Sequence, residues 1–337
     1  MAGRRDGSGA APGDVSGDVP GDVSGDVPGD VPGDAPADRS ADHRLANAIP
    51  GPFSRIVLGL GARPSPSALA MAADLAQAMR LQLLGLFIED DDLLHMAGLP
   101  FAREIAYPSA RSRPIDPAAM ERALQASAHA ARQALQHRLA GLPVNWAFEV
   151  VRGPVVTRLL ASVVQTDLIV LAAPAGTATG AMPGSGAIVM SLRAARAALM
   201  LVREDRPRGQ PVAVLASPDA SAPAVAATVV ALAQPGGGPV TCLLASPGDG
   251  APGRWEAQLA RLLAARGITV EVHRVTGDGE EVRRWLALAR PGMLVVAGAQ
   301  ALDETLLPDV AAIGCSLLLL PAGAVGVEPA EAARSGP

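Results

Sequence analysis

The sequence predicts an α/β fold of two tandem Rossmann-like domains, because one strand–turn–helix pattern occurs twice along the chain. Each copy has a short apolar strand, a turn marked by Ser and Pro, and an alanine-rich helix. Three segments of the first copy match three of the second in the same order: Arg55–Ala76 with Gln210–Ala233, Glu149–Gly153 with His273–Gly277, and Asp167–Ala173 with Gly292–Gly298. We therefore expect two doubly wound domains, each with a five-stranded, mainly parallel sheet.

In the first copy, Ile56–Leu60 is a nearly continuous apolar run, as expected of a parallel strand covered on both faces. Ser65 can cap the next helix and Pro66 fits its first position. Glu89–Arg113 predicts a short helix and a loop. The other expected elements are strands at Leu83–Ile88, Trp146–Val151, Asp167–Ala172 and Ala198–Val202, and helices at Ala118–Leu139 and Pro154–Val164.

Before these copies lies a repeat of Gly-Asp-Val followed by Ser or Pro, which is too rich in Gly and Pro to form a helix or a sheet. Residues 1–44 hold nine Asp and four Arg, a net charge of −5 that equals the charge of the whole chain, so the remainder is neutral. The expected organisation is a disordered tail at 1–50, domains at 51–206 and 209–323, and a flexible C-terminal tail at 324–337.

Composition excludes several classes of function. A neutral folded part with eight aromatic residues lacks the basic stripe and stacking platforms of a nucleic-acid binder. The chain has no lysine, so a phosphate-loop lysine and Schiff-base chemistry are excluded. No apolar run is long enough to cross a membrane, and the start does not resemble a secretory signal. We expect a cytoplasmic protein whose Cys242 and Cys315 are buried reduced thiols, with a redox pair as the alternative.

The candidate ligand site is a glycine-rich segment after the fourth strand, followed by a helical stretch at Ala187–Ala195. Glycines let backbone amides approach an anion closely, and a helix start directs its free N–H groups at phosphate. The alternative is a plain flexible connection. The residues of this segment are Gly176, Gly180, Gly184, Ser185 and Gly186.

The chain resembles a tandem universal stress protein of the adenine-nucleotide-binding α/β group. The resemblance covers nearly all of Phe53–Gly323 and is carried by the strand order, by Val151-Arg152-Gly153 and by the glycine loop. Ile88–Ile105 also resembles bacterial members with a long insertion after the second strand. The resemblance implies ATP, with Mg²⁺, bound between the end of the first strand and the glycine loop, and dimerisation in many members.

The chain departs from the family pattern at three places. Gly61 stands where ATP-binding members have Asp, and the spacing of Gly176, Gly180 and Gly184 is compressed. In the second domain the glycine loop is missing, and Asp303 and Glu304 would repel phosphate there. We therefore expect nucleotide binding in the first domain only, with the second domain as an intramolecular partner in a pseudo-dimer.

Two classes of function follow. The first is a stress-response regulator that senses ATP or a related nucleotide through the first domain. The second is a nucleotide-independent protein–protein interaction module, which would contact an unknown protein partner through Ala118–Leu139 and Leu99–Ile105. A homodimer is a further partner that the resemblance leaves open. We expect no enzymatic activity, a weak ATPase activity being the one exception left open, and no partner that is a nucleic acid or a membrane.

Other charged residues are expected to have structural roles. Asp90, Asp91, Asp92 and His95 are close in sequence, but they lack the spacing of a metal site, and a solvated strand end is the favoured interpretation. Arg193 and Arg196 follow the glycine loop and could reach an anion, although solvent-facing arginines are commoner. No Ser/His/Asp or Cys/His pattern matches a known catalytic signature.

Overall fold

The computed structural model describes residues 51–106, 108–173, 196–204, 212–217, 219–233, 240–245, 253–275, 279–298 and 314–321. They belong to one compact unit, Ile49–Pro337. The expected tails at 1–50 and 324–337 lie outside the described residues.

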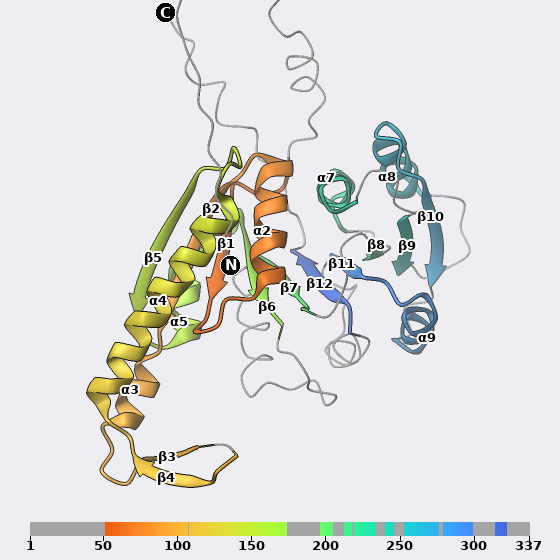
Figure 1. Ribbon diagram of the computed structural model, residues 1–337. Coiled ribbons are helices and arrows are strands. Elements are labelled where there is room, and N and C mark those ends of the chain that lie inside the picture. Colours follow the sequence, from red (N-terminus) through yellow and green to blue (C-terminus); the bar gives the residue numbers. More distant parts are fainter. Residues whose placement is uncertain are drawn as a thin grey trace, which may run out of the picture. The chain divides into compact units, whose positions relative to one another are not determined.

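The first half of the unit is a five-stranded parallel sheet in the order β7-β6-β1-β2-β5. Helices α2 and α4 cover one face and α5 packs on the other (Figure 1). The strands are β1 (Arg55–Leu60), β2 (Gln82–Glu89), β5 (Trp146–Arg152), β6 (Asp167–Ala172) and β7 (Ala198–Val202), and the helices are α2 (Pro66–Met79), α4 (Pro117–Leu139) and α5 (Val155–Ala161).

The second half repeats this strand order as β12-β11-β8-β9-β10, again with parallel pairing. The pairing register also corresponds: Ile56 lies opposite Leu168 in the first half, and Val212 lies opposite Met293 in the second. Its elements are β8 (Val212–Ala216), α7 (Ala222–Leu232), β9 (Val240–Ala245), α8 (Arg254–Ala264), β10 (Val270–Val275), α9 (Gly279–Ala289), β11 (Met293–Ala297) and β12 (Ser316–Leu320).

The two five-stranded sheets join edge to edge into a ten-stranded sheet. Strands β7 and β12 pair antiparallel, with Met200 opposite Leu318, and the Arg203 N–H donates to Ser316 Oγ at 3.1 Å. Both strands are buried, and one hydrophobic cluster continues from the first half into the second beneath α2 and α7, which contact each other. The junction therefore removes two apolar sheet edges from water.

These elements confirm the predicted fold class of two doubly wound, mainly parallel sheets. Apolar runs without interruption gave strand bounds that agree with the structure within two residues, as at Asp167–Ala172. Helix α2 begins as expected, with the Ser65 hydroxyl accepting the Ala68 N–H at 3.1 Å and Pro66 at the first position. Burial on both faces explains the strand bounds, and side-chain capping explains where the helix begins.

The segment between β2 and α4 differs from the expected short helix and loop. Helix α3 (Asp91–Ala97) starts at the carboxylates that close β2, because Asp90 caps it by accepting the Asp92 N–H. An antiparallel hairpin of β3 (Arg103–Ala106) and β4 (Arg111–Pro114) follows. Its strands are short and polar, and its turn places Ala110 at φ 52° without a glycine, so the sequence carries no hairpin signal.

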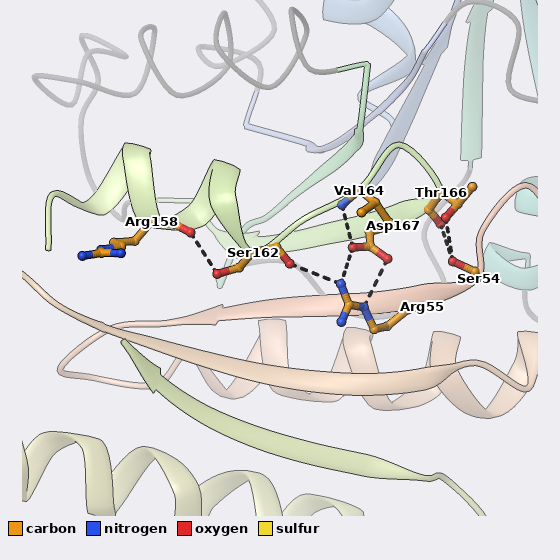
Figure 2. Close-up of polar contacts among 7 residues, drawn as sticks. All are labelled: Ser54, Arg55, Arg158, Ser162, Val164, Thr166 and Asp167. Atoms are coloured by element: carbon orange, nitrogen blue, oxygen red, sulfur yellow. Dashed lines mark hydrogen bonds and ion pairs between the residues drawn. The ribbon is translucent and has the colours of Figure 1, made fainter. Parts of the chain in front are cut away.

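A partly buried ion pair connects the start of β1 to the start of β6 (Figure 2). Asp167 is 1% exposed and accepts from Arg55 Nε at 3.2 Å and from Arg55 Nη2 at 2.6 Å. The Val164 N–H also donates to Asp167, and Arg55 donates to the Ser162 carbonyl, so the loop after α5 is held by the same pair. The hydrogen bond with Asp167 raises the pKa of Arg55. The matched residue of the second half is Gly292, immediately before β11, which has no side chain to form such a pair.

Asp167→Ala should lower the free energy of unfolding by about 2–3 kcal/mol, somewhat below the loss for a fully buried pair because Arg55 is partly exposed. Urea unfolding at neutral pH measures this. Arg122→Ala, which removes the exposed ion pair with Asp116, is the matched control and should change stability little. Equal losses in the two variants would show that burial does not set the strength of the Arg55–Asp167 pair.

Candidate functional site

The strand order locates two crevices where ligands of doubly wound folds bind. The order reverses between β1 and β6 in the first half and between β8 and β11 in the second. Ligands bind beyond the carboxyl ends of the strands at such a reversal. The residues that follow these strands are Gly61 and Ala173 in the first half, and Ser217 and Gly298 in the second. The Arg55–Asp167 pair lies at the opposite, amino ends of the strands and is structural.

In the first-half crevice, no described residue fills the space beside the end of β1. Gly61 is exposed, and a Cβ at this position would have no atom of the described residues within 4 Å. Ala173, which follows β6, is held by its N–H, which donates to the Val202 carbonyl at 2.7 Å. The Ser65 hydroxyl is engaged in capping α2. The turn from β1 into α2 therefore leaves space for a ligand group next to Gly61.

The second-half crevice is closed by the protein's own polar side chains. Ser217 is buried, its hydroxyl bonds to the Asp219 carboxylate, and its N–H donates to the Ala297 carbonyl at 3.0 Å. Gly298 has φ +98°, and a Cβ there would lie 2.7 Å from Asp219 Oδ1 and closer still to Ser217 Oγ. Trp255 Nε1 donates to the Ala220 carbonyl at 2.6 Å and fixes the same turn. A ligand would have to displace these groups.

Of the predicted site residues, the structure describes Gly61. The glycine-rich segment, namely Gly176, Gly180, Gly184, Ser185 and Gly186, lies outside the described residues, as do the expected helix at Ala187–Ala195, Arg193, Asp303 and Glu304. Whether the glycine loop comes next to Gly61 therefore stays a prediction. The closure of the second crevice by Ser217 and Asp219 was missed in the sequence; the Ser-Pro-Asp turn after β8 was its signal.

An ion-pair network lies at the carboxyl ends of β2 and β5, the strands on the outer side of β1. Arg152 Nε donates to Glu89 Oε2 at 2.9 Å, and Arg152 Nη2 donates to Glu121 Oε1 at 3.0 Å. The pKa of Arg152 is raised by its hydrogen bonds to Glu121 and Glu89. Gly153 completes the brace, its N–H donating to the Glu89 carbonyl. Two carboxylates hold this guanidinium, so it braces β2, β5 and α4 rather than offering a charge to an anion.

The acidic residues after β2 have helical roles. Asp90 caps α3, Asp91 and Asp92 lie in its first turn, and His95 lies in its last turn, the arrangement that favours the helix dipole. Across the described part of the chain, no group of three or more His, Cys, Asp or Glu residues is placed to hold a metal ion. Arg196 precedes β7 and therefore lies at the amino ends of the strands, on the opposite side of the sheet from the crevice.

Both cysteines are buried, and neither forms a disulfide. Cys242 lies in β9 and Cys315 immediately precedes β12, and β8 and β11 lie between those strands. Neighbouring strands are about 4.8 Å apart, so the two thiols are about 14 Å apart across the sheet, too far for a disulfide. Burial, with a smaller contribution from Glu256, raises the pKa of Cys242 to about 12. The buried-thiol interpretation agrees with this placement.

No helix among the described residues has the length and apolar character needed to span a membrane.

Solved structures show which known fold this is. A universal stress protein from Archaeoglobus fulgidus DSM 4304 aligns with a TM-score of 0.50 and 12% identity, over 81% of this chain and 98% of that chain. A putative universal stress protein from Pseudomonas aeruginosa UCBPP-PA14 gives 0.48 and 13%, over 80% and 93%. The cytoplasmic domain of a prokaryotic cation chloride cotransporter gives 0.43 and 12%, over 81% and 98%. On the first of these comparisons, the chain has the universal stress protein fold, as the resemblance predicted.

At the level of sequence, the chain matches no family model and no curated protein.

The two crevices should respond differently to the same added methyl group. Gly298→Ala places a side chain at φ +98° against Ser217 and should lower stability by about 1–3 kcal/mol. Gly61→Ala adds its methyl to open space and should change stability by less than about 0.5 kcal/mol. Thermal or urea unfolding of the two variants measures the difference. A similar loss in both would mean that the first crevice is as filled as the second.

Cys242 should make unfolding depend on alkaline pH. Its folded pKa of about 12 exceeds the value of about 8.5 in an unfolded chain. Its protonated thiol therefore contributes stability fully below pH 8.5, and that contribution is lost as pH rises toward 12. Above pH 8.5 the wild type should lose up to about 1.4 kcal/mol per pH unit relative to Cys242→Val. Parallel stability curves for the two proteins between pH 8 and 10.5 would contradict this.

Proposed function

We propose that the first half of this chain binds an adenine nucleotide, ATP with Mg²⁺, and that the protein is a universal-stress-type regulatory protein. The observation that carries the proposal is the contrast between the crevices. The position after β1 is open at Gly61, whereas the equivalent position of the second half is occupied by Ser217 and Asp219 against Gly298. The shared fold with a universal stress protein supports the same assignment.

The sequence suggests which groups would hold the ligand. Backbone N–H groups of Gly180 and Gly184, with the Ser185 hydroxyl, are suited to bind the phosphates, since glycine permits close approach of amides to an anion. Gly176 and Gly186 would give the segment its conformational freedom. Gly61 would leave room for the adenosine part without offering the carboxylate found there in ATP-binding members of the family.

The proposed role of the second half is structural. Its crevice is closed, and its edge strand β12 pairs with β7 along an apolar, buried seam. The second half would therefore be the intramolecular partner of the nucleotide-binding half, and one chain would bind one nucleotide. A cytoplasmic location and the lack of enzymatic activity, a weak ATPase activity aside, are parts of the same proposal.

A second candidate function is a nucleotide-independent interaction module. Gly61 in place of Asp favours it, and so does the exposure of large apolar side chains after β2, where Phe101 is 76% exposed. In this alternative the crevice stays empty, and a protein partner is recognised through the segment around Phe101.

Thermal unfolding in the presence of ATP, ADP, AMP or cyclic nucleotides, each with Mg²⁺, tests the proposal on the full chain. A ligand at 100 times its dissociation constant adds about 2.7 kcal/mol of stability. We expect ATP to raise the midpoint by about 5 °C, since each kcal/mol raises the midpoint of a unit of this size by about 2 °C. Gly184→Asp should abolish the rise, because a carboxylate would repel the phosphates. No shift with any nucleotide would favour the interaction module instead.

Gly61→Asp tests the assignment of the open space. Since a side chain fits at this position, the added carboxylate should supply a charge-assisted hydrogen bond to the adenosine part and tighten ATP binding about tenfold. Gly61→Ala is the matched control, with the same added methyl group and no acceptor. Isothermal titration measures both. Equal affinities of the two variants would place the nucleotide elsewhere, and a weaker affinity of Gly61→Asp would place phosphate rather than ribose beside Gly61.

A further inference from the structure

The insertion between β2 and α4, residues 90–116, exposes more large apolar side chains than any other described segment. Five of them are exposed there, the most open being Phe101 at 76% and Ile105 at 71%, accompanied by Leu93, Met96 and Leu99. The segment consists of α3, which contacts α4, and the β3–β4 hairpin, which extends beyond the end of α4 away from the sheet (Figure 1). We call residues 90–116 the insertion surface.

The hairpin has little support from the rest of the described structure. Strands β3 and β4 form a separate two-stranded sheet, and every residue of β4 is exposed. Arg103 bonds to Ser112, Arg113 bonds to Glu104, and the Ile115 N–H donates to the Ala102 carbonyl at 3.3 Å. An isolated two-stranded hairpin is marginally stable in water and needs a further layer against its apolar side chains. The exposed Phe101 and Ile105 are therefore suited to be covered.

The insertion surface carries charges of both signs, and its acidic part and its basic part are not paired with each other among the described residues. Its acidic end has Asp90, Asp91 and Asp92 at the start of α3. The hairpin has Arg103, Arg111 and Arg113 against Glu104, a net charge of +2. Among the described residues no ion pair joins the three aspartates to these arginines. One surface thus carries an acidic part, a basic part and the apolar residues between them.

We propose that the insertion surface is the interface of a homodimer, in which the hairpin of one copy lies on α3 of the other. In a dimer with a two-fold axis, the acidic part of one copy can face the basic part of the other copy. The symmetry then repeats the same contact with the roles of the two copies exchanged. The occupant is therefore a second copy of this chain. The inner sheet edges are not available for this purpose, because β7 and β12 already pair with each other.

The acidic end argues for a second copy over an anionic membrane. Exposed Phe, Ile and Arg side chains could by themselves bind a lipid surface, but Asp90, Asp91 and Asp92 lie on the same segment and would be repelled by anionic headgroups. The same carboxylates would strengthen a protein interface that presents arginines in return. This proposal is independent of nucleotide binding, so it can succeed or fail separately from the proposed function.

Sedimentation velocity of the full chain over a concentration series tests the interface. We expect a reversible dimer, and Phe101→Asp should weaken association at least about tenfold, because a buried aromatic anchor appears twice in a two-fold interface. Leu288→Asp is the matched control: Leu288 is an exposed apolar residue of α9, 81% open, and lies outside the insertion surface. The control should dimerise like the wild type.

Charge reversal tests the register of the two copies. Arg111→Asp and Asp92→Arg should each weaken the dimer, and the double variant should recover it, because opposite charges again face each other across the axis. A structural effect of either substitution would not be reversed in this way. A wild type that stays monomeric would overturn the proposal, as would equal weakening by Leu288→Asp. Flotation of a monomer with phosphatidylserine vesicles, lost in Phe101→Asp, would assign the surface to lipid instead.

Discussion

The antiparallel pairing of β7 with β12 is the constraint on which the architecture depends. Each half ends its sheet in a strand that is apolar on both faces, and such a strand cannot remain an open edge in water without inviting association. Pairing the two edges satisfies their backbone groups and buries Met200 and Leu318 at one point. The other strands of each half follow on either side of this pair, and helices α2 and α7 contact each other across it.

Within this common frame the halves differ at both ends of their strands. At the amino ends, the first half has the Arg55–Asp167 pair, and the second half has Gly292 at the matched position. At the carboxyl ends, the first half is open at Gly61, and the second is filled by Ser217 and Asp219. Next to the central strands, the buried polar contact of the first half thus lies at the amino ends, and that of the second half lies at the carboxyl ends. In the second half, Ser217 and Asp219 take the place that a ligand would occupy beside β8.

Sequence reasoning succeeded where burial and local chemistry point the same way. Strands such as Asp167–Ala172 are apolar throughout because both faces are covered, and the Ser65-Pro66 helix start follows from capping. It failed at the hairpin, whose strands hold Arg, Ser and Pro and whose pairing depends on side-chain contacts that no periodicity reveals. At the candidate site, Gly61 was singled out because it stands where the resembled family has Asp, and its role in ligand binding stays a prediction. The Ser217–Gly298 contact joins residues far apart in the chain, so only the fold shows that it closes the second crevice.

The covalent link between the halves has a consequence for stoichiometry. Two identical subunits that meet through such an edge always carry two identical crevices, and a substitution in one changes both. Here the edge is formed within a single chain, so dilution does not separate the halves and each crevice can change alone. Among the described residues, the space beside Gly61 is free in the first half and the matched place in the second half is taken by Ser217 and Asp219, an asymmetry that a homodimer built on the same strands cannot adopt.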